Sequence, residues 1–139
     1  MNTIIFTQLN WLAIFCGAVA FFLLGALWYS KLLFVKKWLQ YLNIDQDSAD
    51  AKKGMAALIA TSFLMMFFIS ILISVLRTRL NISGMEGGLK LGTVTGLLGS
   101  FAIFINYLYE KKPGGLFLIN GGYALAGNII SSLIICNWV

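Results

Sequence analysis

The chain has 139 residues, of which 60% are hydrophobic and only 11% are charged, whereas a soluble domain carries roughly 25% charged residues. The charged side chains gather in three islands, 31–53, 77–90 and 110–112, and each of the four uncharged stretches around them is long enough to cross a bilayer. This distribution excludes an ordinary soluble domain, and the net charge of +5 does not indicate nucleic-acid binding because the lysines flank the apolar stretches, where anionic lipid head groups attract them.

The first predicted membrane span covers about residues 8–30. Trp11 lies near its start and Trp28-Tyr29 near its end, as is typical of aromatic side chains at the two membrane–water interfaces. The next segment, "KLLFVKKWLQYLN" at 31–43, is too charged to cross. Its polar side chains recur on one helical face, so we expect a short amphipathic helix in the interface, with Trp38 at head-group depth. A charged loop is the alternative.

Three further spans follow a polar loop. The second covers about 54–76, the third about 87–109 and the fourth about 116–137, and "PGG" at 113–115 is a strong helix break between the last two. The pattern predicts an all-α fold, a four-transmembrane-helix bundle with the short interfacial helix between helices 1 and 2. We expect residues 1–139 to form a single integral membrane domain.

The distribution of basic residues predicts the orientation of these spans. Four spans place both termini on one side of the membrane. The loop at 31–53 has five Lys residues and the loop at 110–115 has two, whereas the opposite side has only Arg77, Arg79 and Lys90. Since basic residues are enriched on the cytoplasmic side, we expect both of those loops to be cytoplasmic and both termini to lie outside.

Small side chains recur four residues apart along the third span and its start. Helices in lipid associate through close packing and interhelical hydrogen bonds, and small residues permit the close approach. The fourth span has a similar stripe that includes Gly121 and Asn128. We therefore expect the third and fourth helices to touch closely, with the first nearby. The predicted packing residues of the third helix are Gly84, Gly88, Gly92, Gly96 and Ser100.

Polar side chains of the last two spans permit two interpretations. They can bond a neighbouring helix, for about 0.6–2 kcal/mol each, or they can line a polar path through the bundle. No acidic or basic residue is expected in mid-membrane, which argues against a proton-driven carrier but not against facilitated passage. The residues of the candidate path are Asn106, Asn120, Asn128 and Ser131.

Aromatic and polar residues that the topology places in one leaflet suggest a second kind of site. We predict a cytoplasm-facing pocket there, built by the end of the first span, the interfacial segment and the end of the third span. The alternative is that the aromatic residues only set the depth and orientation of the chain. The candidate pocket residues are Trp28, Tyr29, Trp38, Asn106, Tyr107 and Glu110.

The sequence offers no catalytic, cofactor-binding or metal-binding residues. It has no histidine, which is the commonest general base and metal ligand. Cys16 and Cys136 lie in apolar stretches without the spacing of a metal site, so we expect them to pack as small apolar residues, and the sequence does not decide whether they pair. We also find no paired carboxylates at one depth, so we expect no enzymatic activity.

Four stretches give the chain a resemblance to a known family: "NWLAIF" at 10–15, "LGALWYSKLLFVKKW" at 24–38, "EGGLKLG" at 86–92 and "NYLYEKKPGGLFLINGGY" at 106–123. With them the chain resembles the small bacterial membrane proteins of domain of unknown function 1761 (DUF1761). Lys31 stands where that family often has Pro, and Ala124 where it often has His. The resemblance implies a four-span protein of the bacterial inner membrane. It supplies no catalytic residues, because the family has no established activity.

These observations favour a non-enzymatic packing or interaction protein, either a homo-oligomer or an accessory subunit of a membrane complex. The alternative is a small-molecule transporter or channel with a polar path along the third and fourth helices. The expected partners are membrane lipid and a second copy or another membrane protein, with no nucleic acid, and any small-molecule ligand is left open.

Overall fold

The computed structural model describes residues 4–30, 36–37, 40 and 55–138, and the elements in these ranges are helices. A short helix, α1 (Ile4–Thr7), precedes α2 (Trp11–Trp28), and the remaining long helices are α5 (Met55–Leu80), α6 (Gly84–Glu110) and α7 (Gly114–Asn137). Within the described ranges, α2, α5, α6 and α7 are long and apolar enough to cross a membrane. The predicted all-α architecture with four candidate membrane-spanning helices is therefore confirmed.

The helix boundaries differ from the predicted spans for local reasons. α5 continues to Leu80, beyond the predicted end at 76, with Arg77 and Arg79 in its last turn. Cations are favourable there because they face the partial negative charge of the helix carboxyl end. α2 starts later than predicted, at Trp11, because Asn10 caps it: Oδ1 of Asn10 accepts a hydrogen bond of 3.1 Å from the Ala13 amide.

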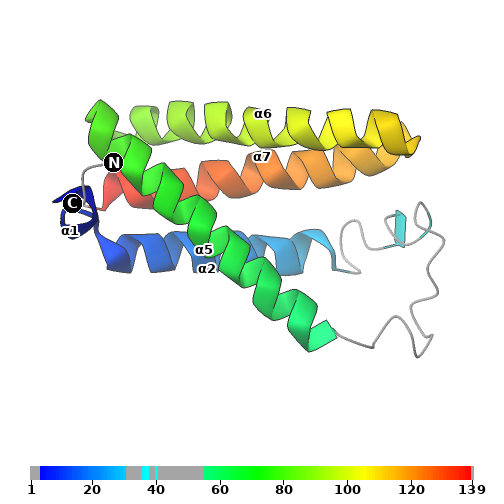
Figure 1. Ribbon diagram of the computed structural model, residues 1–139, viewed down its shortest axis with the longest axis horizontal. Coiled ribbons are helices and arrows are strands. Elements are labelled where there is room, and N and C mark those ends of the chain that lie inside the picture. Colours follow the sequence, from blue (N-terminus) through cyan, green and yellow to red (C-terminus); the bar gives the residue numbers. More distant parts are fainter. Residues whose placement is uncertain (1–3, 31–35, 38–39, 41–54, 139) are drawn as a thin grey trace.

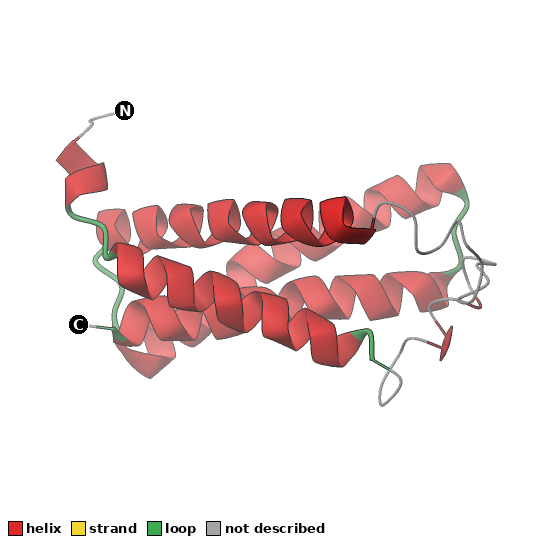
Figure 2. Ribbon diagram, turned by 90° about the horizontal axis from the view of Figure 1, so that it is seen from below, coloured by secondary structure: helices red, strands yellow, loops and turns green. Residues whose placement is uncertain are grey.

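Helix α7 lies at the centre of the bundle and contacts α2, α5 and α6, with α6 as its most extensive neighbour. α2, α6 and α7 run nearly side by side, and α5 crosses them obliquely (Figure 1). α1 and the end of α7 lie at one end of the bundle, and the turn between α6 and α7 lies at the other (Figure 1, Figure 2). The close contact expected between the third and fourth helices is thus observed.

Glycines allow α6 to approach the backbone of α7. A Cβ atom on Gly92 would lie 2.5 Å from the Ile129 Cα, which is closer than real Cβ contacts come. Gly88 and Gly96 meet the α7 backbone in the same way, one turn on either side. Ser100 continues the stripe, because its hydroxyl donates a 2.7 Å hydrogen bond to the Gly121 carbonyl.

Gly84 does not belong to this contact, although the spacing placed it there. A Cβ atom on Gly84 would have nothing within 4 Å. Its φ of +81° lies in the left-handed region that favours glycine, so this residue serves the turn that starts α6. The packing stripe accordingly begins at Gly88.

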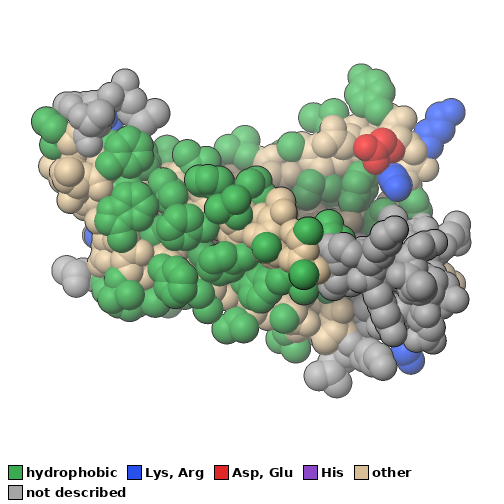
Figure 3. Space-filling view, turned by 60° about the horizontal axis from the view of Figure 1, so that its bottom comes forward, with side chains coloured by type: hydrophobic (Ala, Val, Ile, Leu, Met, Phe, Trp, Pro, Cys, Tyr) green, Lys and Arg blue, Asp and Glu red, His purple; other side chains and the backbone are tan. Residues whose placement is uncertain are grey.

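The surface separates apolar flanks from charged ends. Apolar side chains cover the flank of the bundle, whereas the Lys, Arg, Asp and Glu side chains in view lie near its ends (Figure 3). Of the predicted interfacial segment at 31–43, Lys36, Lys37 and Gln40 are helical and exposed. The rest of that segment, including Trp38, lies outside the described residues, so the interfacial helix stays a prediction.

Candidate functional site at the end of α2

Two aromatic side chains at the end of α2 reach across to α7. Trp28 is the last residue of the helix, and Tyr29 caps it by donating its amide to the Gly25 carbonyl at 3.0 Å. The indole Nε1 of Trp28 donates to the Ile119 carbonyl at 2.9 Å, and the Tyr29 hydroxyl donates to Oδ1 of Asn120 at 2.6 Å. These two bonds fasten the end of α2 to the second turn of α7.

Asn120 extends this connection to a third helix. Its Nδ2 donates a 2.6 Å hydrogen bond to the hydroxyl of Tyr107 on α6. A single chain of hydrogen bonds, Tyr29 to Asn120 to Tyr107, therefore links α2, α7 and α6. All three side chains are half-buried, and such bonds hold membrane helices together where burial of apolar surface contributes little.

Tyr123 lies at the centre of the aromatic side chains. Its ring meets Phe21 and Tyr29 edge to face, with centroid separations of 5.3 and 5.4 Å, and Trp28 at 6.2 Å. Its hydroxyl donates to the Phe21 carbonyl at 3.0 Å. Gly25 makes room for this hydroxyl, since a Cβ there would lie 2.5 Å from it. We call Trp28, Tyr29, Tyr107, Asn120 and Tyr123 the aromatic–asparagine cluster.

Polar residues deeper in the bundle also bond within the protein. The buried hydroxyls of Ser70 on α5 and Ser131 on α7 are 2.9 Å apart. Gly17 on α2 faces them, and a Cβ there would lie 2.8 Å from Oγ of Ser131, so three helices meet at this point. Asn128 turns back to its own helix and donates to the Ala124 carbonyl at 2.7 Å.

The structure brings together three residues of the predicted pocket, Trp28, Tyr29 and Tyr107, and joins the two tyrosines to Asn120 of the predicted polar path. Asn106 and Glu110 are exposed on α6 and are not among the hydrogen-bond partners of the cluster, and the pocket itself stays a prediction. Trp38 lies outside the described residues, and the predicted set did not include Tyr123. The one signal in the sequence for Tyr123 is Gly25, which leaves room for the Tyr123 hydroxyl where a side chain would otherwise stand.

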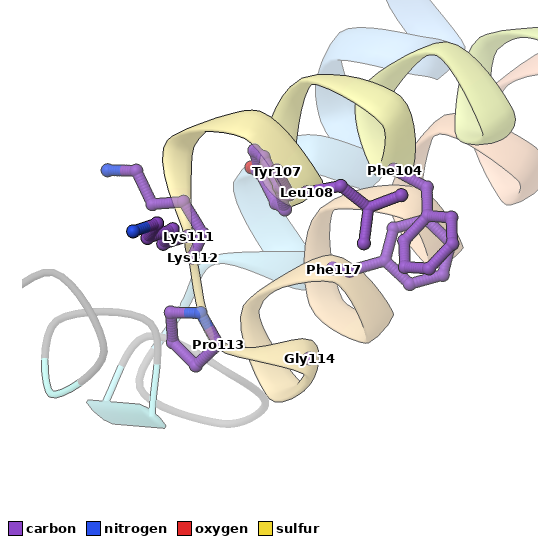
Figure 4. Close-up of a pocket in the computed structure, with 8 residues that line it drawn as sticks. All are labelled: Phe104, Tyr107, Leu108, Lys111, Lys112, Pro113, Gly114 and Phe117. Atoms are coloured by element: carbon purple, nitrogen blue, oxygen red, sulfur yellow. The ribbon is translucent and has the colours of Figure 1, made fainter.

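A cavity of about 210 Å³ lies beside this cluster, at the turn between α6 and α7. Tyr107 belongs to both, with its hydroxyl in the cluster and its side chain in the cavity wall. Figure 4 shows lysines at one end of the lining and phenylalanines at the other. The lining residues are Phe104, Tyr107, Leu108, Lys111, Lys112, Pro113, Gly114 and Phe117.

Groups with reactive or metal-binding chemistry are sparse in the part of the chain that the structure describes. There, no three His, Cys, Asp or Glu side chains come together in a way that could hold a metal ion. Cys16 is half-buried and Cys136 is buried, and both thiols are free.

These features define the class of this protein, a helical bundle with four candidate membrane-spanning helices, of which the polar and glycine-rich last one forms the centre. The chain belongs to the family described as "Protein of unknown function (DUF1761)", whose model matches residues 12–136. The match covers the whole aromatic–asparagine cluster and confirms the resemblance drawn from the sequence. No curated protein and no solved structure matches the chain.

Proposed function

We propose that this protein is a non-enzymatic component of the bacterial inner membrane that acts by packing a helix against a second copy of itself or another membrane protein. The observation that carries the proposal is the start of α5. Residues 56–62 are exposed on every side of the helix, where α5 crosses away from the other helices (Figure 1). Only 11% of the most apolar window of α5 is buried, against 39% for α7.

The exposed start of α5 has two different faces. At 100° per residue, Ala56, Ala57, Ala60 and Thr61 share one face, and the bulkier Leu58 and Ile59 lie on the other. Two small residues spaced by four let a second helix come close enough for backbone-level packing. Such a face favours a neighbouring helix, because lipid tails pack equally well on large apolar side chains and do not require small ones.

The hydrogen bonds inside the bundle favour this role over transport. Ser131 bonds Ser70, and Asn128 bonds its own helix, so these polar groups need no water-filled path to satisfy them. One cavity lies at the α6–α7 turn, and a second, of about 600 Å³, is lined by residues that include Cys16, Leu133 and Trp138. Neither is lined by Asn120, Asn128 or Ser131.

The experiment is a mass measurement of the protein purified in a mild detergent, with one bulky substitution on each face of α5. We expect an oligomer or a complex for the unchanged chain, dissociation by Ala57→Ile on the small face, and no effect of Ser62→Ile on the opposite face. Cross-linking in intact membranes through a cysteine at position 57 identifies a partner that detergent removes. A lone monomer in detergent together with no cross-linked product in membranes would contradict the proposal.

A further inference from the structure

We propose that the cavity at the α6–α7 turn binds an anionic phospholipid, with the phosphate beside Lys111 and Lys112 and an acyl chain against Phe104 and Phe117. The cavity lies at the end of the two helices, where head groups meet the hydrocarbon in a four-span protein. Its volume of about 210 Å³ is large enough for part of a lipid, namely the phosphate region of the head group and the first segment of one acyl chain.

The two ends of the cavity differ in chemistry in the way that the two parts of a phospholipid differ. Lys111 and Lys112 are exposed, and both side chains extend on the same side of the turn, away from the phenylalanine pair (Figure 4). The exposed carboxylate of Glu110 precedes them in sequence but is not part of the lining. Basic pockets between membrane helices at this depth are suited to anionic lipid head groups.

The apolar end explains why the ligand is a lipid and not a free phosphate ion. The rings of Phe104 and Phe117 are in contact at a centroid separation of 4.8 Å, with their planes tilted by 47°, and Leu108 is 60% exposed beside them. These side chains offer a surface for a hydrocarbon chain but no donor for an anion. A soluble phosphate would use only the lysines and would leave this surface bare.

Two backbone features support a binding role. Lys111 caps α6 in the left-handed conformation, with φ of 56°, although glycine or asparagine is favoured at that place because other side chains are strained there. The chain thus keeps a lysine where glycine would fold more easily. At Gly114, a Cβ atom would meet nothing within 4 Å, so the wall of the cavity is open at this residue.

The test is native mass spectrometry of the purified full-length protein in mild detergent, titrated with phosphatidylglycerol or with phosphatidylcholine of the same acyl chains. We expect preferential binding of one phosphatidylglycerol. Lys111→Asn or Lys112→Gln alone should weaken that binding by about 5-fold, and the double variant should weaken it by roughly 30-fold. Asn tolerates the left-handed cap, so the fold is kept, and circular dichroism checks this. Gly114→Leu, which changes no charge, should weaken binding by filling the opening.

The matched control replaces Lys36 and Lys37 with Gln, which removes the same charge outside the cavity. An equal loss in this control would show diffuse attraction to a basic surface and would overturn the site. Equal binding of phosphatidylcholine would overturn the anionic head group. Complete displacement of the lipid by millimolar inorganic phosphate, which lacks an acyl chain, would assign the lysines to a soluble anion instead. The readout counts bound lipids per chain, so it is independent of the α5 interface.

Discussion

The substitution Gly92→Ala tests how the bundle is held together. The added methyl group would lie 2.5 Å from the Ile129 Cα, 2.9 Å from the Asn128 carbonyl oxygen and 3.0 Å from the Ile129 amide nitrogen. All three atoms belong to the α7 backbone, so no side-chain rotation relieves the overlap. Carbon atoms in contact prefer about 3.5–4.0 Å, so α6 and α7 must move apart locally by roughly 1 Å or more.

The energetic effect has two parts of opposite sign. Overpacking a close contact costs about 1–3 kcal/mol, while replacing glycine by alanine within a helix contributes up to about 1 kcal/mol of stability. Gly99→Ala on the same helix separates the two parts, because a Cβ at Gly99 has nothing within 4 Å. We expect Gly92→Ala to be less stable than Gly99→Ala by about 1–3 kcal/mol. Separation of the helices also loosens the contacts of Gly88 and Gly96, which favours the upper part of that range.

The assay is reversible unfolding of the detergent-solubilised protein by increasing sodium dodecyl sulfate, followed by tryptophan fluorescence. Trp28 reports on the bundle because its ring lies against Tyr123 and its Nε1 bonds α7. Gly92→Ala should lower the unfolding midpoint, and Gly99→Ala should leave it unchanged or raise it. If both variants unfold at the same midpoint, the backbone contact between α6 and α7 does not limit the stability of the bundle, and the reasoning fails.

Two further predictions concern the cluster and the orientation. Tyr29→Phe removes the donor to Asn120 but keeps the ring against Tyr123, so it should cost about 1 kcal/mol in the same unfolding assay; adding Tyr107→Phe should cost less than the sum, because both hydroxyls share Asn120, and strict additivity would contradict the hydrogen-bond chain. A fluorescent reporter that matures only in the cytoplasm, fused after Val139, should stay dark, since the positive-inside rule places the termini outside, and a bright reporter would reverse the orientation.

The sequence was sufficient for the number of membrane helices and for the main contact between them. Charge distribution alone separates four apolar stretches, because an ionisable side chain in hydrocarbon is costly wherever it lies on the helix. The spacing of Gly88, Gly92 and Gly96 predicts the contact between α6 and α7 in the same way, since residues four apart lie on one face of a helix. Both inferences depend only on local composition and spacing, which a single sequence contains in full.

The aromatic–asparagine cluster could be predicted only in part. Tyr29 and Asn120 are 91 residues apart, and their contact depends on how far α2 and α7 rotate about their own axes. An aromatic residue near a helix end suits the membrane–water interface whether it faces lipid or a neighbouring helix. The positions of Trp28 and Tyr29 in the sequence therefore did not indicate which helix they contact. Asn106 and Asn120 likewise looked equivalent in sequence, yet only Asn120 faces the other helices.

The order of hydropathy among the helices accounts for the peripheral position of α5. α5 is the most apolar of the four candidate spans and the least buried, whereas α7 is the least apolar and the most buried. This order is the reverse of that in a water-soluble protein. In lipid, polar groups need hydrogen-bond partners within the protein, whereas large apolar side chains can face the hydrocarbon without cost. Composition therefore accounts for α5 at the edge, but not for the small face formed by Ala56, Ala57, Ala60 and Thr61. Small residues permit a neighbouring helix to come close, and within the described residues no helix covers this face. The face therefore predicts that a helix of a partner packs there.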